Sequence, residues 1–257
     1  MTGKRTIALD GKTLRGSFDH LNDRAAAHVL SAFASDVALI LAHQEVAGAP
    51  GEIPAVPTLI TELGVSGVLF TADALHCQKD SFTRAAKTDN GLLVQVKRNQ
   101  PTLHETLARL CAEHRPFDSH ETGGVARSIG WSSTPAGPRV AAADRLRVSR
   151  LTFEKDTRTG LWPSREEIGF YACQIRLDAE TLARAVRSHW GIENRDHYVR
   201  DVTLGEDDSR IRQRPGAMAR IRSTALNILR AKGIQNVSQA LYVNALNFDQ
   251  LLALGSS

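Results

Sequence analysis

Short apolar runs separated by glycine, proline and polar clusters recur along the first hundred residues, and their lengths suit strands better than long helices. Two of these runs, at residues 26–34 and 37–44, are joined only by Ser35-Asp36, a connection short enough for a hairpin. The other elements that we expect are strands at 6–10, 68–73 and 92–96, helices at 56–63 and 78–88, and a helix that begins at Pro101. A hairpin combined with strand–helix–strand units predicts an α/β fold with a mixed sheet flanked by helices.

The pattern changes after about residue 115. Glycine and proline punctuate residues 116–170, and short strand-like pieces lie at 126–131 and 147–153, so we expect a β-rich insertion. A strand at 169–175 follows, and then a helix with Asp178 as its N-cap. The sequence therefore predicts three regions: the first part of the core (1–115), the insertion (116–170), and the completion of the core with basic C-terminal helices (171–257).

Three acidic residues stand beside apolar positions. Asp10 and Asp73 each close an apolar run, and Glu193 lies within His189-Trp190-Gly191-Ile192-Glu193-Asn194. At 100° per residue Glu193 shares a stripe with Leu182 and Val186, so its carboxylate is expected to point at the core. Buried carboxylates are costly unless they are paired or bound to a cation, and a shared metal would explain all three. A buried Glu193 paired with His189 or Arg200 is the alternative.

Carboxylate oxygens are the ligands that Mg²⁺ prefers, and Mn²⁺ substitutes for it readily. Three carboxylates can hold two ions, one to activate an attacking water or 3′-hydroxyl and one to stabilise the departing oxygen of a phosphodiester. The acids Asp10, Asp73 and Glu193 therefore predict phosphoryl chemistry on a nucleic acid, with no covalent protein nucleophile.

The charge is mildly basic overall and uneven along the chain. Lysine and arginine outnumber the acids 32 to 28, for a net charge of +4, yet Arg210 to Lys232 holds seven basic residues and no acid. This run is either a solvated helix face or a surface that follows phosphates. Within it, one helical face is expected to dock on the core while Arg220 lies on the other face; the docking residues are Met218, Ile221, Ala225, Ile228 and Leu229.

The cysteine content and the hydropathy of the chain indicate its cellular compartment. Cys77, Cys111 and Cys173 are odd in number and far apart, which favours neither a disulfide framework nor a zinc site. No apolar stretch approaches the roughly 20 residues that a bilayer span needs. We expect a cytoplasmic protein without a membrane partner.

Several long segments together resemble one family. They are Ile7 to Ser17, Thr71 to Gln78, Val96 to Gln100, His189 to Asn194, Asp201 to Thr203 and Glu206 to Arg210. In content and order they resemble the H-repeat (Rhs-element-associated) insertion-sequence transposases, a branch of the DDE transposases. The resemblance implies a ribonuclease H-like fold, Asp10, Asp73 and Glu193 as the catalytic, metal-binding acids, and magnesium-dependent cutting and joining of DNA.

The sequence departs from that group in places. The wider group often carries Tyr, Arg, Glu and Lys where this chain has Val186, His189, Glu193 and Arg200, and Gly123 to Arg127 replaces a Gly-His-Gly-Arg type loop, which we expect to be impaired. Because Asp10 is almost at the start, we also expect an N-terminally truncated copy with weakened recognition of element ends.

Polar residues around the acids are candidates for DNA contacts. The strand-end candidates could also be ordinary loop residues, and the full set is Lys12, Arg15, Lys97, Asn99, Gln100, His189, Asn194, Arg200, Arg210 and Arg212. For Trp190 packing is favoured over stacking on an unpaired base. His76 and Cys77 are assigned no catalysis, because adjacent residues on a turn seldom aim at each other.

The sequence thus predicts a DDE transposase: hydrolysis exposes a 3′-hydroxyl at an element end, which then attacks target DNA. The expected partners are element-end and target DNA and, in a synaptic complex, a second copy of the chain. A structure-specific nuclease of the same fold and a decayed remnant that binds DNA without cutting it are the alternatives.

Overall fold

The computed structural model describes residues 4–113, 129–132, 144–153, 164–247, 249 and 252. The chain forms two compact units, the first from Met1–Thr6 and Gly64–Arg187 and the second from Ile7–Leu63 and Ser188–Ser257. The three regions expected from the sequence, divided at residues 115 and 170, stay a prediction. The altered loop at 123–127 lies outside the described residues.

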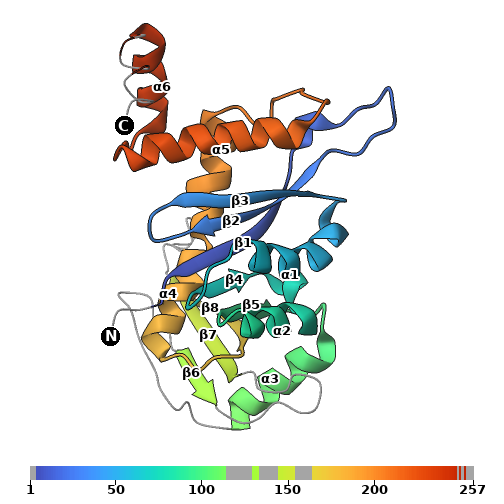
Figure 1. Cartoon of the computed structure of the whole chain (residues 1–257). Coiled ribbons are helices and arrows are strands. Elements are labelled where there is room, and N and C mark those ends of the chain that lie inside the picture. The colour runs from blue at the N-terminus through green and yellow to red at the C-terminus, as the bar shows by residue number, and fades with distance from the viewer. Residues whose placement is uncertain are drawn as a thin grey trace, which may run out of the picture. The chain divides into compact units, whose positions relative to one another are not determined.

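The second unit contains an antiparallel meander of three strands. β1 (Thr6–Thr13) pairs with β2 (His28–Ala34), which pairs with β3 (Leu39–Val46), and all seven residues of β2 are buried. The expected hairpin is confirmed, but its connection runs from Ser35 to Ala38 and is longer than the predicted Ser35-Asp36 link. The helices α1 (Glu52–Glu62) and α5 (Pro215–Ala231) both contact β3, and α5 runs along it in Figure 1. Short 3₁₀ helices at Arg15–Ser17 and Ala49–Gly51 and the helix α6 (Val237–Leu246) complete this unit.

β1 is longer than the sequence indicated. The run ending at Asp10 predicted a strand end there and a loop from Lys12 onward, whereas Gly11, Lys12 and Thr13 continue the ladder opposite Leu30, Val29 and His28. The prediction was wrong because a polar residue interrupts the apolar pattern without interrupting the backbone pairing. Asp10 therefore lies inside a strand, opposite Ser31.

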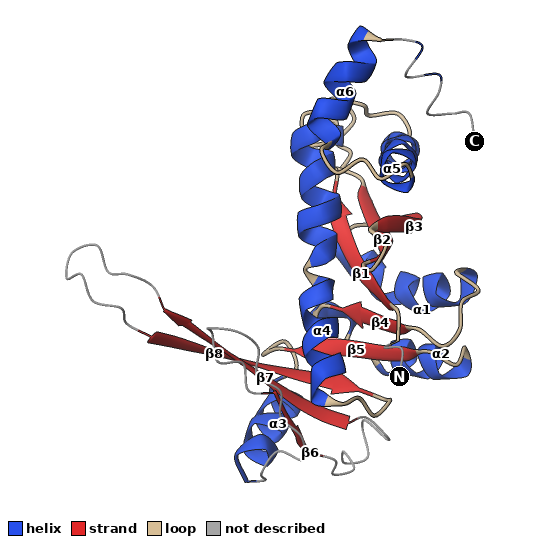
Figure 2. Ribbon diagram, turned by 90° about the vertical axis from the view of Figure 1, so that its left-hand side faces the viewer, coloured by secondary structure: helices blue, strands red, loops and turns tan. Residues whose placement is uncertain are grey.

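The first unit holds a mixed sheet. β4 (Leu69–Ala72) is parallel to β5 (Gly91–Val96), and α2 (Lys79–Lys87) connects them after a 3₁₀ turn at Ala74–His76. β8 (Ser164–Cys173) pairs antiparallel with β5, and the order continues through β7 (Asp144–Phe153) to β6 (Ile129–Ser132), as Figure 2 shows. The helix α3 (Pro101–Glu113) contacts these three strands. The expected mixed α/β class is confirmed.

The helix α4 (Ala179–His189) begins where the sequence placed it. The backbone N–H of Thr181 donates to Asp178 Oδ1 at 2.7 Å, so Asp178 is the N-cap. Leu182 and Ala185 are buried in the core of the first unit beside Leu69 and Leu93. Beyond α4, the chain in the second unit forms π-helical turns at Ile192–His197 and Val199–Thr203.

The buried face of α5 differs from the expected one. Ile221 and Ile228, predicted to dock on the core, are 59% and 40% exposed. The inward side chains include Ser223 and Asn227: Asn227 Nδ2 donates to Ile40 O at 2.7 Å, and Ile40 N donates to Asn227 Oδ1 at 2.9 Å. Hydrogen bonds to β3 therefore set the rotation of the helix, and hydrophobic spacing alone cannot reveal them.

No described helix is long and apolar enough to cross a membrane.

Candidate active site

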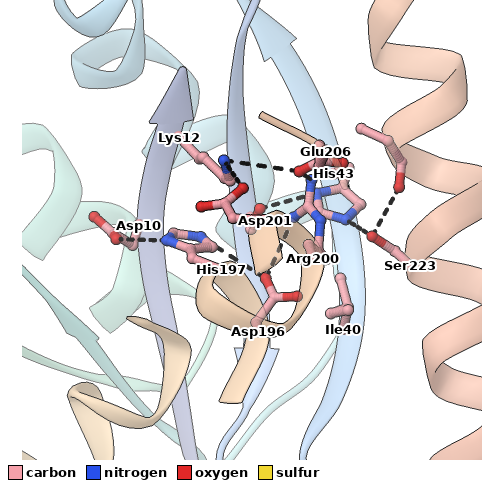
Figure 3. A network of polar contacts seen from close by, with 12 residues as sticks. Asp10, Lys12, Ile40, His43, Asp196, His197, Arg200, Asp201, Glu206 and Ser223 are labelled. Carbon is pink, nitrogen blue, oxygen red and sulfur yellow. Dashed lines mark hydrogen bonds and ion pairs between the residues drawn. The ribbon is translucent and has the colours of Figure 1, made fainter. Parts of the chain in front are cut away.

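Asp10 lies in the interior of β1, and its side chain is 23% exposed. Its Oδ2 atom is 3.5 Å from Nδ1 of His197, as Figure 3 shows. The next residue is glycine for a steric reason: a Cβ atom on Gly11 would lie 2.0 Å from Oε1 of the buried Glu52. Glu52 in turn is 2.5 Å from His28 Nε2. The strand that carries Asp10 is thus fitted closely to a buried His–Glu pair.

Asp73 follows β4 and caps the 3₁₀ turn at Ala74–His76. Its Oδ1 atom accepts the N–H of Leu75 at 2.9 Å, while 44% of the side chain remains exposed. The amide of Asn99 donates to Ala74 O at 2.9 Å, and the amide of Gln100 donates to Cys77 O. Both amides come from the polar cluster after β5. In the structure they hold the turn that follows Asp73, whereas the sequence suggested DNA contacts for them.

Glu193 is exposed, so the prediction that its carboxylate points at the core was wrong. The prediction extended the α-helical period from Leu182 through residue 193. The π-helical segment starts at Ile192, and a π turn takes up about one residue more than an α turn, which shifts every later side chain around the axis. Ile192 and Asp196 are the buried positions of this segment.

The argument from desolvation also changes, because none of Asp10, Asp73 and Glu193 is buried. Two buried acids of the second unit, Asp196 and Glu206, have a basic partner. Asp196 Oδ2 lies 3.4 Å from Arg200 Nη1, and Glu206 Oε2 lies 2.6 Å from Arg200 Nη2. The alternative of a buried acid paired with Arg200 is therefore realised by Asp196 and Glu206 in place of Glu193.

Arg200 is completely buried, and its guanidinium faces these two carboxylates (Figure 3). Burying a guanidinium group costs roughly several kcal/mol of stability unless charged partners compensate for its lost hydration. The burial contradicts the expectation that Arg200 contacts DNA.

Lys12 belongs to the same group of charges. It is 7% exposed, and its Nζ atom lies 2.5 Å from Asp201 Oδ1, 3.0 Å from Asp207 Oδ1 and 3.9 Å from Glu206 Oε2. Lys12 thus points into the protein, against the expectation that it binds a phosphate. We call Lys12, Arg200, Asp196, Asp201, Glu206 and Asp207 the ion-pair cluster. It joins β1 to the segment that follows Glu193.

Two cations and four acids make up this cluster, so it has a formal excess of two negative charges (2 − 4 = −2). Burial raises the pKa of Asp196 to about 6, although Arg200 opposes that shift. Two histidines lie beside the cluster. Burial, with Arg200 next in importance, lowers the pKa of His43 and of His197 to about 3 in each case, so both rings are neutral at pH 7. A neutral His197 faces Asp10.

His43 connects β2, β3 and α5. Its Nδ1 is 2.8 Å from Ser31 Oγ, and its Nε2 contacts Ser223 Oγ. Ser31 and Ser223 are buried, so this Ser–His–Ser chain is a packing element of the unit, without access for a substrate.

The remaining candidates for DNA contact are more accessible. Arg15 is 80% exposed, with Nη1 3.7 Å from Asp207 Oδ2, and Arg212 donates through Nε to Phe18 O at 3.0 Å. Exposed side chains are also found at Lys97, Asn194 and Arg210, and His189 is half-buried.

Two further predictions concern single residues. Trp190 is 53% exposed, so the packing favoured from the sequence was wrong, and its indole is available on the segment that carries Glu193. Burial raises the pKa of Cys77 to about 11, which makes its thiolate scarce at neutral pH.

Carboxylates that remain open to solvent suit a magnesium site, because all three predicted ligands offer hard oxygen atoms. Asp73 keeps one oxygen atom outside its capping bond, and Glu193 is exposed. Within the part of the chain that the structure describes, no group of three or more His, Cys, Asp or Glu side chains is arranged to hold a metal ion. Asp10 and Glu193 belong to the second unit and Asp73 to the first, and their joint metal site stays a prediction.

Sequence reasoning missed the acids of the ion-pair cluster and the contact between His197 and Asp10. One local signal existed: Asp196 stands four residues before Arg200, which is a helical pairing distance. The pairing of Lys12 with Asp207, 195 positions later in the chain, has no local signal.

Comparison with known proteins supplies the family. The model of the transposase DDE domain matches residues 1–229. The chain is 30% identical over 242 residues to the H repeat-associated putative transposase YhhI of Escherichia coli K12, a match that covers 88% of this chain and 64% of that protein. The putative protein YbfL of the same strain is 31% identical with the same coverage. The chain therefore spans a little under two thirds of the length of these relatives.

The fold has a counterpart among solved structures. A piggyBac transposase, determined as a synaptic complex with hairpin DNA, superposes with a TM-score of 0.51 at 13% identity, covering 93% of this chain and 51% of that one. The expected ribonuclease H-like class of fold is confirmed. With its family match over residues 1–229, the chain belongs to the DDE-domain transposases and is related to the H repeat-associated members.

Proposed function

We propose that the chain cleaves DNA and transfers strands through Asp10, Asp73 and Glu193, with Mg²⁺ or Mn²⁺ as cofactor. The observation that carries the proposal is the difference in solvent exposure between these three acids and two acids of the ion-pair cluster. The three proposed acids remain open to solvent, whereas Asp196 and Glu206 are buried against Arg200. Solvent exposure leaves carboxylate oxygen atoms within reach of a metal ion, which a buried ion pair does not.

The ion-pair cluster provides the rigidity that such a site requires. Lys12 stands two residues after Asp10 on β1, and it is bound to Asp201 and Asp207, which follow Glu193 in the chain. These ion pairs tie the strand of Asp10 to the segment that carries Glu193. Preorganised groups cost no reorganisation during the reaction, so fixing the supporting elements favours catalysis.

The bound divalent ions would supply Lewis acidity at the scissile phosphate and lower the pKa of an attacking water. Asp10, Asp73 and Glu193 would hold them. His197, neutral and 3.5 Å from Asp10, limits the rotation of that carboxylate without adding positive charge beside it. Asn99 and Gln100 restrain the turn after Asp73 in the same manner.

DNA is the proposed partner, in keeping with the transposase family and with the hairpin DNA named in the related synaptic complex. Lys97, Asn194, Arg210 and Arg212 are solvent-accessible and are proposed to contact it, together with Arg15. The exposed Trp190 suits stacking on an unpaired base. A pair of copies in a synaptic complex is part of the proposal.

A cleavage and strand-transfer assay tests the function. With an element-end duplex and Mg²⁺, the wild type is expected to nick the DNA and join the new 3′-hydroxyl to a target, whereas Asp73→Asn and Glu193→Gln should lose both products. Glu62→Gln, a change at an exposed acid outside the site, is the matched control. Equal activity in the two site variants would refute the assigned roles.

The same assay separates the alternatives. Nicks without joined products would indicate a structure-specific nuclease, and salt-sensitive binding without any metal-dependent cutting would indicate a DNA-binding remnant.

A further inference from the structure

The second unit contains a cavity at the N-terminal end of α5, with a volume of about 630 Å³. Four arginines, Arg24, Arg212, Arg214 and Arg220, line it together with one acid, Glu45. In Figure 1 this end of α5 lies beside the loop that joins β1 to β2, and the hydrogen bond from Arg212 to Phe18 connects the two. None of the proposed catalytic acids lines the cavity. We call these five residues the arginine pocket.

Two of the four arginines are oriented by hydrogen bonds that do not neutralise their charge. Arg212 Nε donates to Phe18 O at 3.0 Å, and Arg220 Nη2 donates to His43 O at 3.3 Å. Among the described residues, none of the four guanidinium groups lies within 4.0 Å of a carboxylate. With Glu45 counted, the formal charge of the lining is +3 (4 − 1 = 3). A guanidinium held by an uncharged carbonyl keeps both its full charge and further N–H donors for a ligand.

The backbone adds to the positive potential of the pocket. α5 is 17 residues long, Pro215 occupies its first turn, and Arg214 precedes it with φ of 50°, in the left-handed region. The first N–H groups of a helix have no partner within the helix, and they carry the positive end of its dipole.

Glu45 lies against this helix end: a Cβ atom on Gly216 would be 2.3 Å from Glu45 Oε2. An acid of the protein itself thus stands where an external anion would be favoured.

We propose that the arginine pocket binds a backbone phosphate of DNA, at a place separate from the catalytic acids. This rests on the proposed function, since DNA is the ligand. Arginine forks match the oxygens of a phosphate in a bidentate manner, and three net positive charges exceed what one phosphodiester needs. All four arginines are exposed, so a continuous strand can pass over them. The pocket anchors DNA and takes no part in the cleavage step.

Binding measurements in the absence of metal isolate this site from cleavage. Fluorescence anisotropy with a labelled duplex is measured for the wild type and for the double variant Arg24→Ala with Arg214→Gly. Among the residues that the structure describes, neither side chain has a hydrogen-bond partner, and glycine tolerates the left-handed conformation at position 214. The control removes two other exposed arginines, Arg109→Ala with Arg184→Ala, each of which forms a surface ion pair.

The pocket variant should lose about tenfold in affinity at low salt, and the slope of log K against log salt should become shallower by about 0.9, the value for one lost phosphate contact. The control should bind within about twofold of the wild type. Equal losses in both variants would overturn the proposal, because they would show a general charge effect. If the wild type bound no DNA at all, the proposed function itself would fail.

Two additional arms distinguish the ligand. Inorganic phosphate is titrated against both proteins: a phosphate affinity that depends on the arginines, combined with unchanged DNA affinity, would assign the pocket to a small phosphate ligand and overturn the assignment to DNA.

Glu45→Gln keeps the size of the side chain while removing the negative charge. It should tighten DNA binding by about threefold, whereas Glu62→Gln should change it little. An unchanged or weaker affinity in Glu45→Gln would contradict the proposal.

Discussion

Arginines in two regions of the second unit have opposite surroundings. In the ion-pair cluster Arg200 is fully buried between Asp196 and Glu206, whereas in the arginine pocket Arg212 and Arg220 are exposed and held by backbone carbonyls. The first arrangement satisfies the charge inside the protein, and the second leaves the charge available. The partner of a basic residue, more than its place in a motif, decides whether it stabilises the fold or binds a ligand.

The largest expected effect follows from removing the buried cation. Arg200→Ala would leave Asp196 and Glu206 without their partner, at a cost of about 3–5 kcal/mol in the free energy of unfolding. Urea denaturation followed by circular dichroism measures it. Arg24→Ala, at an exposed position of the arginine pocket, should change stability by less than about 0.5 kcal/mol. Comparable effects of the two changes would remove the distinction between the regions.

Substitutions of Trp190 test whether its exposed indole binds unpaired DNA. Trp190→Ala should weaken binding of single-stranded or unpaired DNA by about 1–3 kcal/mol, with Trp190→Phe retaining much of the affinity, and both variants should keep the stability of the wild type. Anisotropy titrations and thermal melts measure the two properties. A large drop in stability without loss of binding would restore the packing role that the sequence favoured.

A substitution of Asn99 tests whether its amide holds the turn after Asp73. Asn99→Ala removes the hydrogen bond to Ala74 O, so the turn after Asp73 should loosen and the cleavage rate should fall by about tenfold, since a misplaced group can cost more than that. DNA affinity should stay near that of the wild type. Weaker DNA binding with an unchanged rate at saturating DNA would instead support the direct contact expected from the sequence.

The effects of titration next to the ion-pair cluster are the most restricted, because they appear only when the pH falls below about 6.5. The pKa of His43 is lowered from 6.5 to about 3, so its contribution to stability is complete above pH 6.5 and is lost as the pH falls toward 3. The pKa of Asp196 is raised from 3.8 to about 6. Its contribution to stability is therefore complete below pH 3.8 and is lost as the pH rises from 3.8 to about 6. The free energy of unfolding, measured by denaturation between pH 4 and pH 7, should depend less on pH in His43→Gln and more on pH in Asp196→Asn. Parallel curves for the wild type and both variants would contradict these shifts.

Much of the fold was predictable from the sequence. The apolar runs located β2, β3, β4 and β5, and Asp178 marked the start of α4, because burial and capping are local in sequence. The predicted faces of α5 and of the segment around Glu193 were wrong for reasons that local patterns do not contain. In α5, Ser223 and Asn227 turn inward to bond with β3, and at Glu193 a π-helical turn breaks the period.

The metal-binding role of the three acids in the candidate site stays a prediction, whereas the DNA contacts expected for two of its cations were wrong. Asp10, Asp73 and Glu193 are solvent-accessible, as a site requires. Arg200 points inward to Asp196 and Glu206, which are near it in the chain, and Lys12 points inward to acids that are far from it in the chain. Those meetings depend on the tertiary fold. Arg24 and Arg214 escaped notice for the same reason, since only the folded unit places them around one cavity.

Calorimetric titration of Mn²⁺ into the full chain, in the presence of duplex DNA, tests the central claim most directly. The account predicts saturable binding in the wild type that is strongly weakened in each of Asp10→Asn, Asp73→Asn and Glu193→Gln and is unchanged in Glu62→Gln. Identical metal binding in the wild type and the three site variants would show that these acids do not share a metal, and it would contradict the account.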